Sequence, residues 1–165
     1  MADSKRLVVL KTLSQFLRDE IKTANGYQHT LAAVSRGRLF ISDTEALPMI
    51  SILENFNPDR EPAEVGGHQG RGVKDNWVLL LQGWAADDKA NPSDPAHLLM
   101  ADTKKALAKI VKEDGPQYMF GGLIANMHIE PGVIRPPTEA SPRAYFYLRV
   151  VVEVTEYLDD PYRLD

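Results

Sequence analysis

A glycine-rich segment with basic neighbours is the first candidate for chemistry in this sequence. Four glycines fall within Gly66–Gly72, and Arg71 and Lys74 stand at its end. Such loops cradle phosphate groups when they follow a strand and open a helix whose N-terminus faces the anion. Here a predicted strand follows, from Trp77, and no Gly-Lys-Ser/Thr sequence occurs. The segment therefore predicts a surface loop, and Arg71 and Lys74 are candidates for contact with an acidic partner surface.

Other residue types that catalyse reactions or bind metals are scattered. The four histidines show no metal-binding spacing and fall on different predicted elements: His29, His68, His97 and His128. The pairs Asp87-Asp88 and Asp159-Asp160 lie in a loop and in a tail, without the dry cleft that general acid-base catalysis requires. The chain has no Gly-x-Ser-x-Gly motif and no cysteine. We therefore predict no catalytic residue, no metal site and no cofactor, and expect a protein that is not an enzyme.

Charge and hydropathy exclude two further classes of partner. The 165 residues carry a formal net charge of −4, with a pI near 5.6, which argues against specific binding to nucleic acid. The apolar run Leu7–Leu10 is too short for a signal peptide or a membrane span, so we expect a soluble protein. One helix carries four lysines, interpreted as a solvated face, with DNA or an acidic neighbour as the alternative: Lys104, Lys105, Lys109 and Lys112.

The segment from Arg143 to Tyr157 alternates with period two for longer than most strands run. Its apolar side predicts a core face: Ala144, Phe146, Leu148, Val150, Val152 and Val154. At roughly 3.3 Å per residue such a strand would reach about 40 Å. The other side carries tyrosine and arginine, which are typical interface anchors. We predict that the assembly interface includes six residues: Arg71, Lys74, Arg143, Tyr145, Tyr147 and Arg149.

Two helices and a set of strands must position these residues. Helices are predicted from Ser4 to Ala24, stopped by Asn25-Gly26, and from the N-cap Asp94 to Glu113. Strands are predicted at 29–35, 49–54, 77–85, 123–129 and 143–157. Two long loops and a tail are expected to be mobile: 56–75, 130–142 and 158–165.

These elements predict one α+β domain spanning residues 1–165. Two helices cannot cover both faces of such a sheet, so we expect a mostly antiparallel or mixed sheet with both helices packed on one face. Glu20 falls inside the apolar arc of the first helix. It either reaches solvent at the helix end or forms a buried ion pair at a subunit contact.

The order of the elements resembles the tail terminator (tail completion) proteins of long-tailed bacteriophages. The resemblance covers nearly the whole chain, about residues 5 to 157. Its segments are the helix 6–24, the strand before the Arg36-Gly37-Arg38 turn, the strand opened by Leu47-Pro48, the strand 77–85, the helix 95–113 and the long last strand.

The resemblance implies a virion structural protein. Such a protein forms a hexameric ring that caps the tail tube, stops its elongation and provides the surface for head-tail joining. Its partners would be further copies of itself, the tail tube protein, head-tail connector or neck proteins and a sheath, with DNA passing through the ring. It would be assembled in the host cytoplasm and reside in the tail or neck of the virion. The family supplies no residue-level motif, so the interface residues rest on side-chain chemistry alone.

Two other interpretations stay open. The loops 56–75 and 130–142 are long for a minimal terminator and would suit another phage neck or head-tail connector protein. A small ligand-binding α+β domain that uses the Gly66–Gly72 loop is the other alternative.

Overall fold

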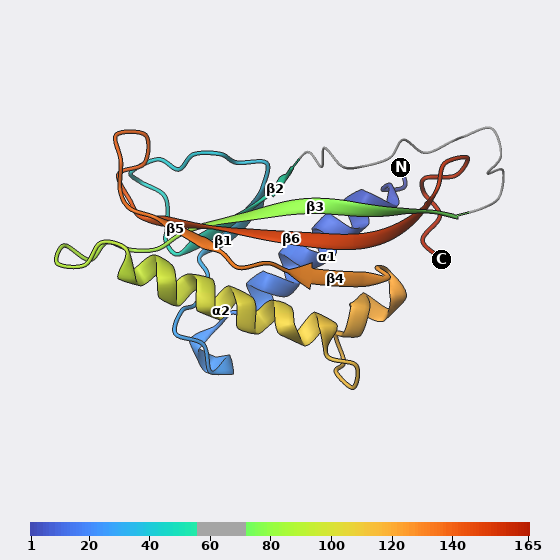
Figure 1. The fold of residues 1–165 in the computed structure, drawn as a ribbon, viewed down its shortest axis with the longest axis horizontal. Coiled ribbons are helices and arrows are strands. Elements are labelled where there is room, and N and C mark those ends of the chain that lie inside the picture. The colour runs from blue at the N-terminus through green and yellow to red at the C-terminus, as the bar shows by residue number, and fades with distance from the viewer. Residues whose placement is uncertain (56–71) are drawn as a thin grey trace.

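The computed structural model of the chain describes residues 1–55 and 72–165. This described part forms a six-stranded mixed sheet with two α-helices (Figure 1). The strands are β1 (Ala33–Arg36), β2 (Met49–Glu54), β3 (Gly72–Trp84), β4 (Asn126–Ile129), β5 (Val133–Arg135) and β6 (Tyr145–Tyr157). The helices are α1 (Lys5–Glu20) and α2 (Asp94–Val111), with short 3₁₀ turns η1 (Thr23–Asn25) and η2 (Tyr118–Gly122).

The long strand β6 holds the sheet together. The strand order is β1-β2-β3-β6-β4, and β5 also pairs with β6. The β1–β2 pair is parallel and the other pairs are antiparallel. All 13 residues of β6 are in register with β3, from Tyr145 opposite Trp84 to Tyr157 opposite Gly72. The sheet is therefore mixed, as the sequence predicts.

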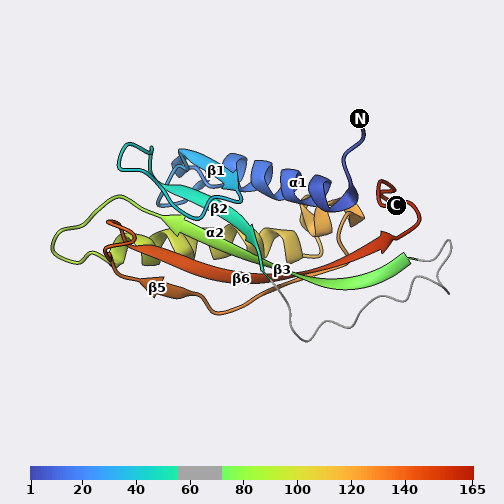
Figure 2. The ribbon, with the colours of Figure 1, turned by 90° about the horizontal axis from the view of Figure 1, so that it is seen from above.

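Both helices pack on the same face of this sheet (Figure 2). Apolar residues of α1 and α2, such as Leu13 and Leu107, form one core cluster with alternate residues of β2, β3 and β6. Every residue predicted for the core face of the last strand is buried, with Phe146, Leu148, Val150, Val152 and Val154 at 0% exposure. The predicted fold class, one α+β domain with two helices on one face, is confirmed.

Helix α1 ends earlier than predicted. Its last helical residue is Glu20, and the chain then forms the 3₁₀ turn η1. Gly26 does adopt the predicted left-handed conformation, with φ of 82°, but it caps η1. At the other helix Ser93 occupies the N-cap position, one residue before the predicted Asp94, which is the first helical residue.

The strand β1 begins four residues later than predicted, at Ala33. The backbone N–H groups of Gln28 and His29 donate to the carboxylate of Asp102 on α2, at 3.2 and 2.9 Å. The Leu31 N–H donates to the Ile21 carbonyl. Because their N–H groups form these bonds, the residues before Ala33 do not pair in the β1 strand ladder.

Two predicted loop boundaries are wrong. Residues 72–75, assigned to the loop 56–75, begin β3, and residues 56–71 lie outside the described residues. Asp75 is 8% exposed and forms an ion pair with Arg6, so its charge is accommodated within the strand. Within the predicted loop 130–142, Val133–Arg135 forms β5 and pairs with the start of β6. The charged Asp75 interrupts the apolar alternation of β3, and β5 has only three residues. Period-two alternation in the sequence therefore predicts neither segment as a strand.

The predicted strand 123–129 is also shorter than expected, because a left-handed turn precedes it. Met119, Phe120, Gly121 and Gly122 all have positive φ angles, of 47°, 51°, 68° and 94°. This conformation costs non-glycine residues roughly 1–2 kcal/mol each. Packing offsets this cost, because Met119 is buried and the Phe120 ring meets Phe16 of α1 edge-on at 5.7 Å.

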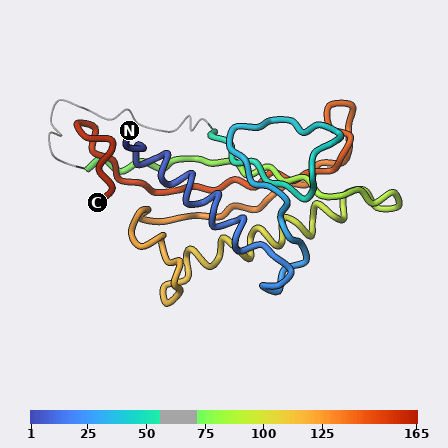
Figure 3. The backbone as a smooth tube through the Cα atoms, turned by 180° about the vertical axis from the view of Figure 1, so that it is seen from behind, coloured from blue at the N-terminus to red at the C-terminus, as the bar shows by residue number. Residues whose placement is uncertain are grey.

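Arg6 joins the first turn of α1 to the far end of the β3–β6 ladder. Its Nε donates to Glu156 Oε2 at 2.7 Å, and its guanidinium pairs with Asp75 and lies 4.9 Å from the Trp77 ring. The hydrogen-bonded carboxylates of Glu156 and Asp75 outweigh burial and raise the pKa of Arg6. The contact fixes α1 across the sheet beside the termini (Figure 3).

Candidate assembly surface

The face of the sheet opposite the helices carries the predicted tyrosines and arginine of β6. Tyr145, Tyr147 and Arg149 alternate with the core residues, so the strand pleat places all three on this face. The rings of Tyr145 and Tyr147 meet edge-on, with centroids 5.2 Å apart and planes at 81°. Trp84 of β3 lies beside them, 6.5 Å from Tyr145. We call Trp84, Tyr145 and Tyr147 the aromatic cluster.

The two arginines near the cluster are held by carboxylates. Arg143 Nη1 lies 3.1 Å from Asp87 Oδ2, and Arg149 Nη1 lies 3.3 Å from Glu130 Oε1. The Nε of Arg149 is buried and has no hydrogen-bond partner among the described residues. Both guanidinium groups are thus oriented by ion pairs within the subunit.

Burial, followed by the neighbouring Tyr145, raises the pKa of Tyr147. Its hydroxyl therefore stays protonated in neutral solution and can donate a hydrogen bond. Protonated phenols and charged arginines suit contact with another protein surface. The cluster contains no nucleophile beside a general base.

The predicted interface residues do not form one patch. Lys74 is exposed on β3 opposite Thr155, ten residues along β6 from Tyr145, or about 33 Å at roughly 3.3 Å per residue. Arg143, Tyr145, Tyr147 and Arg149 gather at the other end of the ladder. Arg71 lies outside the described residues. The structure therefore brings four of the six predicted residues together and separates Lys74 from them.

Two loops border the aromatic cluster, at the left-hand end of the sheet in Figure 1. Leu39 and Phe40, in the connection from β1 to β2, are 58% and 68% exposed. This segment and residues 140–141 line a small cavity of about 50 Å³ over the cluster, together with Gln82 of β3. No sequence pattern predicts this cavity, because its walls come from four separate segments.

A larger hollow of about 720 Å³ lies elsewhere, beside α1 and Arg36. Its lining has charges of both signs, including Lys11, Arg18, Asp19 and Glu20. Before their contacts within the chain are considered, this mixture of charges favours neither an anionic nor a cationic ligand. No group of three or more histidine and carboxylate side chains that could hold a metal occurs within residues 1–55 and 72–165.

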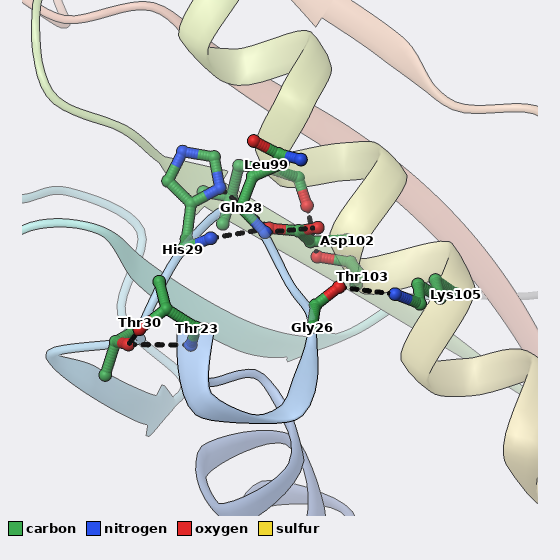
Figure 4. Close-up of polar contacts among 9 residues, drawn as sticks. All are labelled: Thr23, Gly26, Gln28, His29, Thr30, Leu99, Asp102, Thr103 and Lys105. Atoms are coloured by element: carbon green, nitrogen blue, oxygen red, sulfur yellow. Dashed lines mark hydrogen bonds and ion pairs between the residues drawn. The ribbon is translucent and has the colours of Figure 1, made fainter.

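A polar cluster fastens α2 to the segment between η1 and β1 (Figure 4). Asp102 of α2 is 5% exposed, accepts the two backbone N–H groups named above, and its Oδ2 lies 2.8 Å from His29 Nδ1. Lys105 donates to the Gly26 carbonyl at 2.6 Å. Asp102 is not among the residues predicted from the sequence, although a carboxylate beside Thr103 in the apolar arc of a helix indicates a buried polar partner.

Glu20 and Lys109 join the two helices beside this cluster. Glu20 Oε1 accepts from the Tyr27 hydroxyl at 2.7 Å and pairs with Lys109, while Lys105 lies 4.5 Å from the Tyr27 ring. The ion pair of Glu20 is thus formed within the subunit. Two of the four lysines expected on a solvated face make contacts inside the protein.

The Glu20 ion pair predicts a pH-dependent contribution to stability. Burial opposes ionisation, but the hydrogen bonds from Lys109 and Tyr27 outweigh it and lower the pKa of Glu20 below its ordinary 4.5. Because the folded-state pKa is depressed, the stabilisation is present above pH 4.5 and is lost as the pH falls through the folded-state value. Glu20→Gln should therefore lower the free energy of unfolding at pH 7. Urea unfolding of both proteins from pH 7 to pH 3 should show the difference shrinking below about pH 4.5; a constant difference would contradict the assignment.

Comparisons with known proteins concern the fold. No known family matches the sequence, and no curated protein matches it. Among solved structures, the chain is similar to the sheath/tube terminator of an extracellular contractile injection system, PVC, in its extended state. The TM-score is 0.44 at 16% sequence identity, over 89% of this chain and 55% of that one. The chain thus spans about half the length of that protein. No helix in the described part of the chain is long and apolar enough to cross a membrane.

Proposed function

We propose that this chain is a virion structural protein of the tail terminator type. It forms a ring, hexameric by resemblance to that family, which caps the tail tube, stops its elongation and offers a surface for head-tail joining. It resides in the tail or neck, and its partners are copies of itself, the tube protein and neck or sheath proteins. We assign the protein no catalytic role.

The observation that carries the proposal is the aromatic cluster on the helix-free face. Tyr145 and Tyr147 are half-buried on β6 and pack beside the buried Trp84, with Leu39 and Phe40 exposed nearby. Aromatic and arginine side chains contribute disproportionately to binding energy at protein interfaces. A rigid strand surface of this composition suits lasting contact with another protein.

A ring requires two different surfaces on each subunit, because its contacts are heterologous. The elongated sheet provides two ends that differ in composition. The aromatic cluster and two loops lie at one end, and both termini lie at the other (Figure 1). Arg143 and Arg149 border the first end and supply charged contacts around its apolar centre.

Association of the purified subunit tests the self-assembly part of the proposal. We expect the double change Tyr145→Ala and Tyr147→Ala to weaken self-association about 30-fold, because removing an interface hot spot costs roughly 2 kcal/mol. Light scattering over a wide concentration range, with negative-stain images of the same samples, measures this. The matched control is Tyr118→Ala, an exposed tyrosine on η2, and thermal unfolding checks that every variant folds.

Polymerisation of the cognate tail tube protein tests the terminator role itself. Adding the subunit to growing tubes should shorten them in proportion to its concentration and leave a ring at one end of each tube. Tubes that elongate unchanged, with no density added at their tips, would contradict a terminator and favour the connector interpretation.

A further inference from the structure

The large hollow beside α1 contains two arginines without an acidic partner. Arg18 of α1 and Arg36 of β1 both line it, and both residues are exposed to solvent. Neither forms an ion pair with a carboxylate within residues 1–55 and 72–165. Five other arginines each do: Arg6, Arg38, Arg143, Arg149 and Arg163. Two accessible guanidinium groups without a counter-ion in one hollow form a candidate site for an oxyanion.

Uncharged groups hold the two guanidinium groups in place. Arg36 Nη1 donates to Ser14 Oγ at 3.2 Å, and Arg18 Nη2 donates to the Val34 carbonyl at 3.4 Å. Ser14 is itself fixed, because it is 2% exposed and its Oγ donates to the Leu10 carbonyl at 2.7 Å. Each arginine thus reaches from its own element to the other, α1 or β1, which lie side by side (Figure 2). A guanidinium has five N–H donors, so these bonds leave donors for a ligand.

The acidic residues of the same hollow are paired with other groups. Asp19 accepts a hydrogen bond from Gln15 Nε2 at 2.6 Å and lies 3.6 Å from Lys22 Nζ. Glu20 forms its ion pair with Lys109 of α2. Both carboxylates of the lining therefore have partners other than the two arginines.

The charges of the lining fit one monovalent anion. Three cations and two carboxylates line the hollow, which leaves a surplus of one positive charge: Lys11, Arg18, Arg36, Asp19 and Glu20. Lys11 is paired with Asp3 at 2.6 Å, so the surplus lies at the arginines. A carboxylate carries one negative charge and matches the planar guanidinium fork. A phosphate group carries about −1.5 to −2 and would be repelled by the two carboxylates.

The size and the neutral residues of the hollow favour a carboxylate carried on a polypeptide. The volume of about 720 Å³ falls within the range of roughly 300–1,000 Å³ typical of sites that enclose whole ligands. A carboxylate group alone would leave most of this space empty. Thr12, Gln15 and Gln117 supply uncharged donors and acceptors around the arginines. Such side chains suit the backbone amides of a bound segment.

We propose that the hollow between α1 and β1 binds an acidic segment of a partner protein, with an aspartate or glutamate carboxylate of that segment held by Arg18 and Arg36. The site lies away from the aromatic cluster and does not require the ring. It goes beyond the proposed function, because it assigns the subunit a second protein contact with its own chemistry.

Binding of short peptides tests the site, followed by NMR through the side-chain Nε–H signals of arginine in isotope-labelled protein. The probe is a capped Gly-Glu-Gly-Glu-Gly peptide, and Gly-Gln-Gly-Gln-Gly is its uncharged control. The glutamate peptide should shift the signals of Arg18 and Arg36 saturably, and the glutamine peptide should leave them unchanged. Arg18→Gln and Arg36→Gln should each weaken binding about three- to tenfold, as loss of one exposed charge-assisted contact does.

Two further variants separate the site from general charge effects and from misfolding. Arg135→Gln is the matched control, because Arg135 is exposed on β5 and also lacks an ion pair in the described part of the chain, but does not line the hollow. It should bind the peptide as the native protein does. Asp19→Asn removes a negative charge from the lining and keeps an acceptor for Gln15, so it should tighten binding about two- to fivefold. A gain of binding cannot come from a protein that fails to fold.

The outcomes that overturn the proposal are specific. They are shifts that do not saturate, an equal loss in Arg135→Gln, no gain in Asp19→Asn, or inorganic phosphate binding more tightly than the glutamate peptide at the same arginines. Ring formation and tube termination are measured in separate experiments. Failure of peptide binding would therefore leave the proposed function standing, and failure of ring formation would leave this site standing.

Discussion

Gly83→Ala is expected to destabilise the protein by about 1–3 kcal/mol, the usual cost of overpacking a core. A Cβ at this position would lie 2.2 Å from Cε1 of Phe146 and 2.6 Å from its Cζ. Phe146 is fully buried in the core cluster to which both helices contribute, so its ring cannot move aside without disturbing the core. Urea unfolding of the purified variant measures the loss.

The direction of this change is informative, because glycine inside a strand is ordinarily a weak point that alanine improves. Combining Gly83→Ala with Phe146→Leu should cost less than the sum of the single changes, since leucine removes the ring atoms that collide. Strict additivity in this double-mutant cycle, or a stabilised Gly83→Ala protein, would show that Phe146 does not press against this site.

Asp102→Ala is expected to lower the free energy of unfolding by about 2 kcal/mol, because two backbone donors lose a charged acceptor. The N–H groups of Gln28 and His29 both depend on this carboxylate, which also contacts the His29 ring. Without it, the chain between η1 and β1 loses its link to α2. Amide hydrogen exchange should show the local effect as faster exchange at residues 28 and 29.

Two further variants provide an intermediate change and a control for the Asp102 prediction. Asp102→Asn keeps one acceptor oxygen and should lose about half as much stability. Asp114→Ala removes an exposed carboxylate just beyond α2 and should change stability by less than about 0.5 kcal/mol. An Asp102→Ala protein as stable as this control would mean that water replaces the carboxylate at both donors.

The sequence predicts the elements that repeat a simple pattern. The core face of β6 and the bounds of β2 follow from period-two and breaker signals, and the structure confirms both. The helices are also found, because Leu13, Leu17 and Ile21, and likewise Leu99, Leu107 and Ile110, recur at helical spacing. Because two helices cannot cover both faces of such a sheet, the sequence also predicts that both helices pack on the same face.

The missed features depend on partners distant in sequence. The charge of Asp75 favours a loop in the sequence, but in the structure Arg6, 69 positions away, forms an ion pair with this carboxylate within the strand. Residue 29 was predicted to begin a strand, but its N–H, like that of residue 28, donates to Asp102, more than 70 positions away in the sequence. The left-handed turn at Met119 and Phe120 has no local signal, because neither residue favours positive φ.

The candidate surface was predicted in part for the same reason. Strand alternation places Tyr145, Tyr147 and Arg149 on one face from the sequence alone. The distance to Lys74 depends on the register between β3 and β6, and the cavity at Gln82 on two loops that fold over the sheet.

The central position of β6 also governs when the protein can fold. β3, β4 and β5 each pair with β6 but not with one another, although β6 comes last of the six strands in the sequence. A ribosome-bound chain lacking residues 145–157 can pair only β1, β2 and β3, and the latter two strands would expose apolar side chains. The aromatic cluster needs β6 as well, since Tyr145 and Tyr147 belong to it. Most of the strand pairing and the aromatic cluster can therefore form only after residues 145–157 have been translated.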